Sequence, residues 1–285
     1  MPVDSVSRAA LITGCSSGIG RATAEHLAGR GWTVYASARR PESIADLEQA
    51  GCRLLALDVT DEDSMAAAVR QVEEAEGSVG VLVNNAGYSQ SGPVEEVPLE
   101  DVRRQFETNV FGLVRLCQLA LPGMRRQGWG RIVNVSSMGG KLVFPGGGFY
   151  HGTKHAVEAI SDALRWEVRG FGVDVVVIEP GLIKTSFGEV AADSVGAAPA
   201  EGPYAQFTAA VAEATKGAYE GGLARLGGGP ETVARKIEKA ITRRRPRTRY
   251  SVTPSAKMAL LQRRLMSDRM WDGLLRTQFP QPGRG

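Results

Sequence analysis

The sequence contains few cysteines and no long apolar run. Its three cysteines, Cys15, Cys52 and Cys117, form no CxxC pair, which argues against a disulfide framework and favours a reducing compartment. No apolar stretch approaches the roughly 18 residues of a membrane span, so no integral membrane segment is expected. The first ten residues carry Asp4 and Arg8 and no apolar run, unlike a signal peptide. A cytoplasmic protein is therefore expected.

The chain also lacks a strong charge bias and has few histidines. Its formal net charge is +3, and its one basic run, 243–247, has no interleaved aromatic residues, so a solvated loop is favoured over a nucleic-acid contact. His151 and His155 are spaced for one helix face without a third ligand, so pocket lining or surface is favoured and no metal site is expected. Cys15 begins an expected helix, yet no base accompanies it, and a catalytic thiol is not expected.

Segments of strand and helix character alternate along most of the chain. Short runs rich in Val, Ile and Leu are expected to be strands, namely 9–13, 33–38, 53–57, 79–83, 130–135 and 173–178, with 249–253 as an edge strand. The expected helices are 21–31, 43–50, 61–75, 99–124, 150–169, 231–243 and 256–279, with a weaker one at 205–219. This alternation predicts an α/β fold with a doubly wound parallel sheet in a single domain, 1–285. In such sheets ligands bind at the carboxyl ends of the strands.

Glycines cluster directly after the first expected strand. Residues 13–20 read TGCSSGIG. The glycines permit a tight turn and allow the N-terminus of the next helix to approach a pyrophosphate. The position of this segment, between the first strand and the first helix, favours nucleotide binding over a plain turn.

A tyrosine and a lysine, Tyr150 and Lys154, lie four residues apart at the start of an expected helix. At this spacing both side chains lie on one face of the helix, one turn apart. A nearby ammonium favours the tyrosinate and lowers the tyrosine pKa from its usual value of about 10. Tyr150 is therefore a candidate general acid/base.

Taken together, these motifs resemble those of the short-chain dehydrogenase/reductase family. The resemblance covers 9–187 and comprises, in order, the TGCSSGIG loop, Leu57-Asp58-Val59, Asn84-Asn85-Ala86-Gly87, Asn109, Ser137, Tyr150 with Lys154, and Pro180-Gly181 followed by Thr185. It implies a single-domain Rossmann fold with a catalytic core at 9–187, a helical substrate flap at 188–230 and a C-terminal extension at 231–285.

The resemblance implies roles for these residues. Tyr150 would transfer the hydroxyl proton, Lys154 would assist it and bind the nicotinamide ribose, and Ser137 would hold the substrate oxygen. Asn109 would anchor a water that relays protons to Lys154. The residues expected to bind the cofactor are Gly14, Ser16, Ser17, Gly18, Ile19, Gly20, Arg39, Asp58, Val59, Asn85, Ala86, Gly87, Tyr150, Lys154, Pro180, Gly181, Ile183 and Thr185. Among them Asp58 would bind the adenine, Asn85 to Gly87 would line the adenosine side, and Ile183 and Thr185 would lie near the carboxamide.

The residues after the second expected strand favour NADP(H) over NAD(H). A carboxylate there binds the ribose hydroxyls of NAD, whereas a cation accommodates the 2′-phosphate of NADP. The sequence places Arg39 at this point and no acid before Glu42, and a planar guanidinium suits a phosphate. Arg39 and the Ser17 hydroxyl are therefore expected to select NADP(H); the alternative is a solvated Arg39.

Within the family the chain most resembles the branch that includes 17β-hydroxysteroid dehydrogenase type 1 and related retinol dehydrogenases. The similar segments are 11–18, 34–36 with Arg39, 230–234 and 248–250. This implies a bulky apolar ketone or alcohol. The steroid enzyme of this branch has a histidine in the flap among its polar anchors, and no histidine follows His155 here, so the resemblance does not establish a steroid. The residues expected to contact substrate are Ser137, Leu142, Val143, Phe144, Phe149, Tyr150 and Phe187, although several apolar ones could equally be core residues.

The function expected is hydride transfer between NADP(H) and the carbonyl or secondary alcohol of a bulky apolar substrate that is steroid-, retinoid- or ketone-like. The alternatives are a catalytically silent NADP(H)-binding sensor or scaffold, and an epimerase or dehydratase on a related fold. By analogy with the family, the helices 99–124 and 150–169 imply a homodimer or homotetramer. The last helix, with Leu261, Leu265 and Trp271, is expected to dock on the domain, although it could lie on a membrane.

Overall fold

Seven parallel strands form one sheet in the computed structural model, which describes residues 6–185, 187–188, 201–220 and 226–283. The strand order is β3-β2-β1-β4-β5-β6-β7. The strands are β1 (Ala10–Ile12), β2 (Val34–Ala38), β3 (Arg53–Ala56), β4 (Val81–Asn84), β5 (Gly130–Val135), β6 (Val173–Glu179) and β7 (Arg249–Ser251). The expected doubly wound α/β fold is confirmed, and β7 is the edge strand that the sequence predicts.

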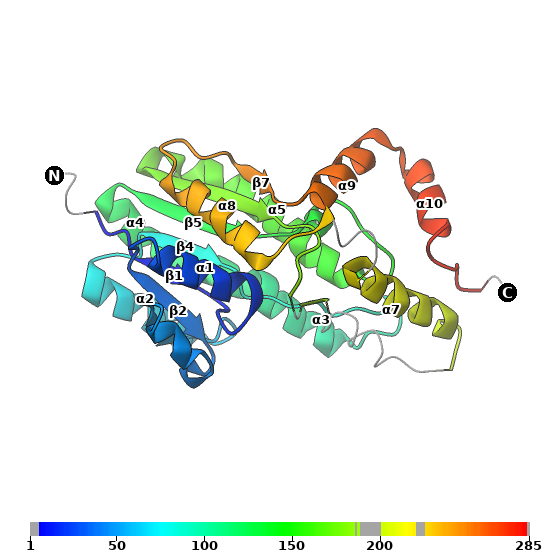
Figure 1. Ribbon diagram of the computed structural model, residues 1–285, viewed down its shortest axis with the longest axis horizontal. Helices are drawn as coiled ribbons and strands as arrows, with labels where there is room; N and C mark the ends of the chain where they lie inside the picture. Colours follow the sequence, from blue (N-terminus) through cyan, green and yellow to red (C-terminus); the bar gives the residue numbers. More distant parts are fainter. Residues whose placement is uncertain (1–5, 186, 189–200, 221–225, 284–285) are drawn as a thin grey trace.

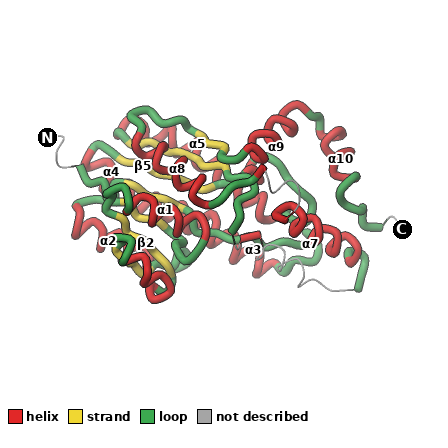
Figure 2. Tube along the Cα trace, viewed as in Figure 1, coloured by secondary structure: helices red, strands yellow, loops and turns green. Residues whose placement is uncertain are grey.

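Helices cover both faces of this sheet (Figures 1 and 2). Helices α1 and α8 pack together on one face, and α2, α4 and α5 cover the other. The helical segments are α1 (Gly18–Ala28), η2 (Pro41–Glu48), α2 (Glu62–Glu76), α3 (Leu99–Phe106), η3 (Glu107–Phe111), α4 (Gly112–Gln127), η4 (Met138–Gly140), α5 (Gly148–Val168), η5 (Arg169–Phe171), α7 (Ala205–Glu220), α8 (Pro230–Thr242), α9 (Pro254–Leu265) and α10 (Asp268–Arg276).

Successive residues of each strand pack into two separate hydrophobic cores, one on each face of the sheet. In β1, Ala10 and Ile12 pack toward α1 and α8, whereas Leu11 packs toward α2, α4 and α5. This is the period of two that a strand imposes, with both faces apolar because both are covered by helices. Strand β6, almost purely β-branched in sequence, is buried along nearly its whole length. The sheet is therefore packed on both faces, and its carboxyl edge positions the site.

The long helical region expected at 99–124 is a helix with a widened turn in its middle. Helix α3 continues through the π-helical turn η3 into α4. Gly112 begins α4, where a Cβ would overlap the carbonyl oxygen of Val59. The helix can therefore approach the segment after β3 closely, and the π-turn contains Asn109, consistent with the frequent occurrence of π-turns at functional sites.

Two expected helices differ in type or number from the observed elements. The segment expected as a helix at 43–50 is η2, a 3₁₀ segment with a non-helical Ile44 (φ −128°). The single helix expected at 256–279 is two helices, because Met266 adopts an extended conformation (φ −96°, ψ 139°). Ser267 then begins a new helix, and its side chain accepts a hydrogen bond from the Met270 amide (3.4 Å). Of the expected flap at 188–230, only 188, 201–220 and 226–230 are described; α7 matches the helix expected there.

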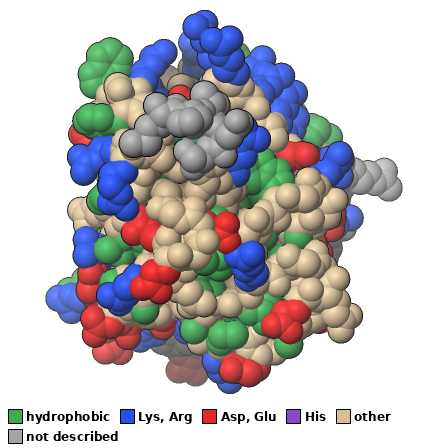
Figure 3. Space-filling model, turned by 90° about the vertical axis from the view of Figure 1, so that its left-hand side faces the viewer, with side chains coloured by type: hydrophobic (Ala, Val, Ile, Leu, Met, Phe, Trp, Pro, Cys, Tyr) green, Lys and Arg blue, Asp and Glu red, His purple; other side chains and the backbone are tan. Residues whose placement is uncertain are grey.

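The two ends of the molecule differ in what they carry. Helices α7, α9 and α10 lie together at one end, on the right in Figure 1, and the N-terminus lies at the other. The latter end, seen in Figure 3, carries Lys and Arg side chains toward its top and intermixed acidic and basic side chains below. Among the described residues, no helix combines the length and the apolar character needed to cross a bilayer.

Candidate active site

The site begins where β1 and β4 lie side by side and the strand order changes direction. The Thr13 hydroxyl accepts hydrogen bonds from the amides of Asn85 and Ala86, both at 3.0 Å. In return the Asn85 side-chain amide donates to the carbonyl oxygens of Thr13 (3.0 Å) and Gly14 (3.2 Å). The segments after β1 and β4 are thus bonded into one unit at the topological switch point, where such sheets bind ligands.

The glycine loop of this unit has a conformation that requires glycine. Gly14 and Gly18 have φ values of +71° and +57°, a region that other residues rarely enter. A Cβ at Gly20 would overlap the Gly14 carbonyl oxygen. Helix α1 can therefore approach the loop closely, and its first turn contains no acidic residue. Ser16 and Ser17 are exposed beside this positively polarised helix end, which suits a pyrophosphate.

Three residues expected to bind the cofactor follow β2 and β3 at the carboxyl edge of the sheet. Arg39 directly follows β2 and is exposed, and no hydrogen bond or ion pair engages its guanidinium within the described ranges. Asp58 follows β3, and its Oδ1 accepts from the amide and the hydroxyl of Thr60 (2.9 and 2.7 Å), which fixes the carboxylate. Val59 is buried, with its carbonyl oxygen close to Gly112.

Lys154 and Tyr150 occupy the first turns of α5 with their side chains adjacent. The Lys154 ammonium lies 5.8 Å from the centroid of the Tyr150 ring and donates to the carbonyl oxygen of Val135 at the end of β5 (2.9 Å). Burial lowers the pKa of Lys154 to about 8, and the carboxylate of Glu158, one turn further along α5, opposes this shift. The lysine is therefore a buried cation beside a half-buried phenol.

Asn109 is held by the backbone of Tyr88. Its Oδ1 accepts from the Tyr88 amide (3.1 Å), and its Nδ2 donates to the Tyr88 carbonyl oxygen (2.9 Å) and to the Thr153 hydroxyl (3.1 Å). A Cβ placed on Gly87 would lie 3.0 Å from Asn109 Oδ1 and 3.7 Å from Lys154 Nζ. The amide and the ammonium thus approach Gly87 together.

Ser137 and Ser136 follow β5 and have different surroundings, as strand alternation predicts. Ser136 is buried, next to the position that a Cβ on Gly140 would take. Ser137 is half-buried and accepts from the Gly139 amide (3.1 Å) as the cap of η4. This second serine is the one expected to hold a substrate oxygen.

His151 supports the loop that carries Ser137. Its ring is buried between two glycines, since a Cβ on Gly139 or Gly147 would overlap it. The His151 Nδ1 donates to the Gly139 carbonyl oxygen (3.1 Å), and the ring lies 5.6 Å from that of Tyr150, edge to face. Burial lowers the pKa of His151 to about 4, so the imidazole is neutral at physiological pH.

The segment after β6 lies over the same edge of the sheet. The Pro180 carbonyl oxygen accepts from the Met138 amide (2.8 Å), which joins this segment to η4. A Cβ on Gly18 would lie 3.2 Å from the Thr185 side chain, so Thr185 reaches the glycine loop. Ile183 is buried in the core, so any contact of this residue with a ligand would involve its main chain.

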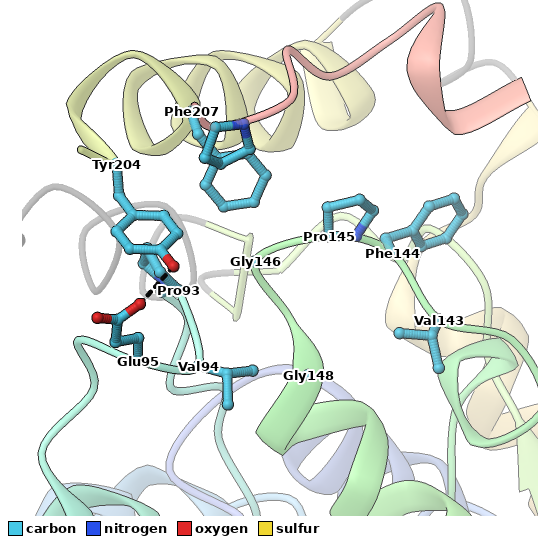
Figure 4. Close-up of a pocket in the computed structure, with 12 residues that line it drawn as sticks. Pro93, Val94, Glu95, Val143, Phe144, Pro145, Gly146, Gly148, Tyr204 and Phe207 are labelled. Carbon is cyan, nitrogen blue, oxygen red and sulfur yellow. Dashed lines mark hydrogen bonds between the residues drawn. The ribbon is translucent and has the colours of Figure 1, made fainter. Parts of the chain in front are cut away.

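A cavity of about 500 Å³ opens beside the start of α5 (Figure 4). Its lining is mostly apolar and comprises Gly92, Pro93, Val94, Glu95, Val143, Phe144, Pro145, Gly146, Gly148, Tyr204, Phe207 and Pro282. Tyr204 in the loop before α7 donates its hydroxyl hydrogen bond to Glu95 (2.6 Å), which links the α7 region to the 92–95 loop at one side of the cavity.

The apolar residues expected to contact substrate have four kinds of environment. Val143 and Phe144 line the cavity. The Phe187 ring lies 5.5 Å from that of Tyr150. Leu142 is only 1% exposed and is a core residue, and Phe149 is half-buried outside the cavity lining. The alternative of core packing thus holds for Leu142.

Several residues that shape the site are not apparent from the motifs. His151 was assigned to pocket lining or surface, yet it supports the Ser137 loop. The Thr13 hydroxyl organises the switch point; Thr13 opens the TGCSSGIG motif, but the motif assigns no role to its side chain. Trp271 is buried, donates Nε1–H to the Val143 carbonyl oxygen (3.3 Å) and lies 5.9 Å from the Phe144 ring. In the sequence, the only indication of this contact is a tryptophan within the amphipathic segment 256–279.

The sheet order and the glycine loop at the switch point define a dinucleotide-binding α/β protein of the Rossmann type. Residues 8–194 match the family model described as short chain dehydrogenase. The chain belongs to this family, as the sequence motifs predict, and the expected class of enzyme, a dehydrogenase/reductase, is confirmed. The assignment to the hydroxysteroid and retinol branch stays a prediction.

Three proteins illustrate the similarity. An NADPH-dependent 3-dehydrocapnine reductase of Ornithobacterium rhinotracheale is 38% identical over 275 residues, covering 93% of this chain and 95% of the reductase. The closed form of a serine dehydrogenase complexed with NADP+ has a TM-score of 0.74 at 27% identity, over 86% of this chain and 94% of that one. A short chain dehydrogenase/reductase of Burkholderia phymatum in complex with NAD has a TM-score of 0.77 at 25% identity, over the whole of both chains.

Proposed function

We propose that this protein is an NADP(H)-dependent oxidoreductase that interconverts a carbonyl and its alcohol on a bulky apolar substrate, with Tyr150 as the general acid/base. The observation that carries the proposal is the Lys154 ammonium beside the Tyr150 ring at the open carboxyl edge of the sheet. Ser137, Asn109 and the cavity complete the set that such a reaction needs. A bound nicotinamide would supply or accept the hydride.

The residues present fit NADP(H). The loop of Gly14, Gly18 and Gly20 leaves space for a pyrophosphate at the start of α1. Arg39 is exposed and has no partner in the described chain, so it is available to a 2′-phosphate. The name of the similar reductase includes NADPH, and the similar serine dehydrogenase is complexed with NADP+; both agree with this choice. The similar Burkholderia protein is in complex with NAD, so NAD(H) is the alternative cofactor.

The proton in this reaction is handled by residues of α5 and η4. Reduction leaves negative charge on the substrate oxygen, and hydrogen bonds from Ser137 and Tyr150 would stabilise that charge as it develops. Tyr150 then gives up its proton, and the buried ammonium of Lys154 stabilises the resulting phenolate. Asn109, which approaches Gly87 together with the Lys154 ammonium, would hold the water through which Lys154 exchanges protons with solvent.

The lining of the cavity beside the start of α5 favours an apolar substrate. The cavity beside Gly148 is lined by Pro93, Val94, Val143, Phe144, Pro145 and Phe207, and Phe187 lies next to Tyr150. Apolar walls with a few polar groups at one end are typical of small-molecule sites. The reductase named above supports the direction of reduction when NADPH is supplied.

The test is turnover of steroid, retinoid, acyl and aromatic carbonyls by the wild type and by Tyr150→Phe, with NADPH and with NADH. We expect NADPH to be preferred and the variant to lose at least about two orders of magnitude in kcat, as for removal of a general acid. NADPH binding by fluorescence titration should be nearly unchanged, because the ring is kept. Full turnover by Tyr150→Phe would refute the mechanism. Tight NADPH binding without turnover on any substrate class would favour the sensor or scaffold alternative.

A further inference from the structure

A stripe of large apolar side chains lies exposed on α9. Met258, Leu261 and Leu265 are 51%, 58% and 73% exposed. At about 100° per residue these three positions fall within roughly 60° of the helix circumference. They therefore form one continuous apolar stripe on a single face, and Met270 on α10, 56% exposed, adds a fourth exposed apolar side chain nearby in the chain.

Cations border this stripe. Lys257 and Arg264 are exposed, and on the same helical count they fall beside Leu261. The segment 254–276 contains five cations, namely Lys257, Arg263, Arg264, Arg269 and Arg276, against Asp268 and Asp272, a difference of three positive charges. The surface thus combines a narrow apolar stripe with positive charge, and this short segment alone carries a surplus equal to the net charge of +3 of the whole chain.

The two helices are anchored at the rim of the cavity. Trp271 of α10 is buried against Phe144 and bonded to Val143, and the guanidinium of Arg263 lies 5.8 Å from the Trp271 ring centroid. At the other end, Thr253 caps α9 by accepting from the Ala256 amide (3.2 Å). The inner side of the α9–α10 pair is therefore occupied, and the apolar stripe is left without a partner in the described chain.

We propose that the exposed face of α9 and α10 docks on an anionic phospholipid surface. The apolar stripe would enter the boundary between headgroups and acyl chains, and Lys257 and Arg264 would contact lipid phosphates. The positive charge favours an anionic bilayer as the partner of this face, because an apolar stripe bordered by cations is complementary to anionic headgroups above acyl chains. Docking does not depend on the proposed reaction; if that reaction holds, it places the mouth of the cavity close to a store of apolar substrate.

The test is co-sedimentation of the full chain with vesicles of phosphatidylcholine alone or mixed with phosphatidylglycerol. We expect binding to the mixed vesicles, weaker binding to the neutral ones, and release as salt is raised because the attraction is screened. Leu261→Ser with Leu265→Ser should weaken binding by about tenfold or more, since both side chains lose apolar contact. Lys257→Gln with Arg264→Gln should abolish the preference for anionic vesicles.

Matched controls come from the opposite end of the sheet. Phe171→Ser removes an exposed aromatic residue, and Arg244→Gln with Arg245→Gln removes two exposed cations; both variants should bind as the wild type does. Absence of binding, equal binding to neutral vesicles, or unchanged binding by the α9 variants would overturn the proposal. It would also be overturned if Leu261→Ser with Leu265→Ser lowered the molar mass in light scattering, because the stripe would then join copies of the chain. Circular dichroism and thermal unfolding serve as the check that each variant is folded.

Discussion

His151 shows how a single buried side chain makes stability depend on pH. Its pKa is lowered by burial from 6.5 to about 4, so between these values the unfolded chain binds a proton that the folded chain does not. The stability is complete above about pH 6.5 and is lost as the pH falls toward 4. The full shift corresponds to about 3 kcal/mol, of which about 2 kcal/mol is lost at pH 5.

The prediction is tested by urea unfolding of the wild type and of His151→Gln at pH 7 and pH 5. The variant should be less stable at pH 7, because a glutamine fills the space between Gly139 and Gly147 less well. Its loss between the two pH values should be smaller than that of the wild type by about 2 kcal/mol. His26, His155 and the carboxylates are common to both proteins and cancel in this difference. Equal losses would show that His151 titrates normally in the folded chain.

The sequence predicts individual residues well where their relation is local, and poorly where it is not. Tyr150 and Lys154 are one helical turn apart, so their proximity follows from their spacing. The contact of His151 with Gly139 and Gly147 depends on how the η4 loop folds back on α5. A sequence motif does not show how a loop folds back on a later helix. The same reason explains Leu142, whose side chain points into the core although its neighbours line the cavity.

At the scale of elements, the junction of β1, the glycine loop and α1 depends on one missing methyl group. A Cβ at Gly20 would overlap the Gly14 carbonyl oxygen, which is main chain and cannot rotate away. In Gly20→Ala the helix must move from the loop, with a cost of about 1–3 kcal/mol. We expect a lower melting temperature and an NADPH affinity reduced by about tenfold, since the start of α1 is displaced from the phosphates.

Gly217→Ala is the matched control for this substitution. Gly217 lies within α7, and no atom would come within 4 Å of an added Cβ. Alanine there should leave stability unchanged or raise it by up to about 1 kcal/mol, because it is the better helix former. Both variants are compared by thermal unfolding and by NADPH fluorescence titration. If Gly20→Ala matched the wild type in both, the loop would be wider than the structure shows.

The order of elements was predictable because hydrophobic period and length distinguish buried strands from amphipathic helices. The segment Gly130–Val135 is β5 as expected, and the other core strands differ from expectation only at their ends. The break between α9 and α10 was missed since Met266 and Ser267 interrupt no apolar periodicity. That break turns α10 so that Trp271 reaches Phe144, a tertiary contact that the local pattern does not encode.

At the scale of the whole molecule, the exposed side of α5 suits association with a second copy. The exposed positions Gly152, His155, Ala159, Ala163 and Trp166 recur every three or four residues and form one face. Four of the five are small or intermediate in size, and Trp166 is 78% exposed. Small side chains allow two helices to approach, and an exposed tryptophan is typical of an interface. We therefore propose that this face forms the homodimer or homotetramer contact.

In a twofold contact each residue of this face meets its own copy or a near neighbour, so one introduced charge is repeated across the interface. Ala159→Arg should therefore lower the molar mass, measured by light scattering at micromolar concentration, from that of a dimer or tetramer toward the monomer. Ala45→Arg in η2, which lies on the other face of the sheet and is exposed, adds the same charge and should leave the mass unchanged. A monomeric wild type would refute the proposed contact. An oligomer that tolerates Ala159→Arg would assign the interface to another surface, and the exposed Trp166 would then need a different explanation.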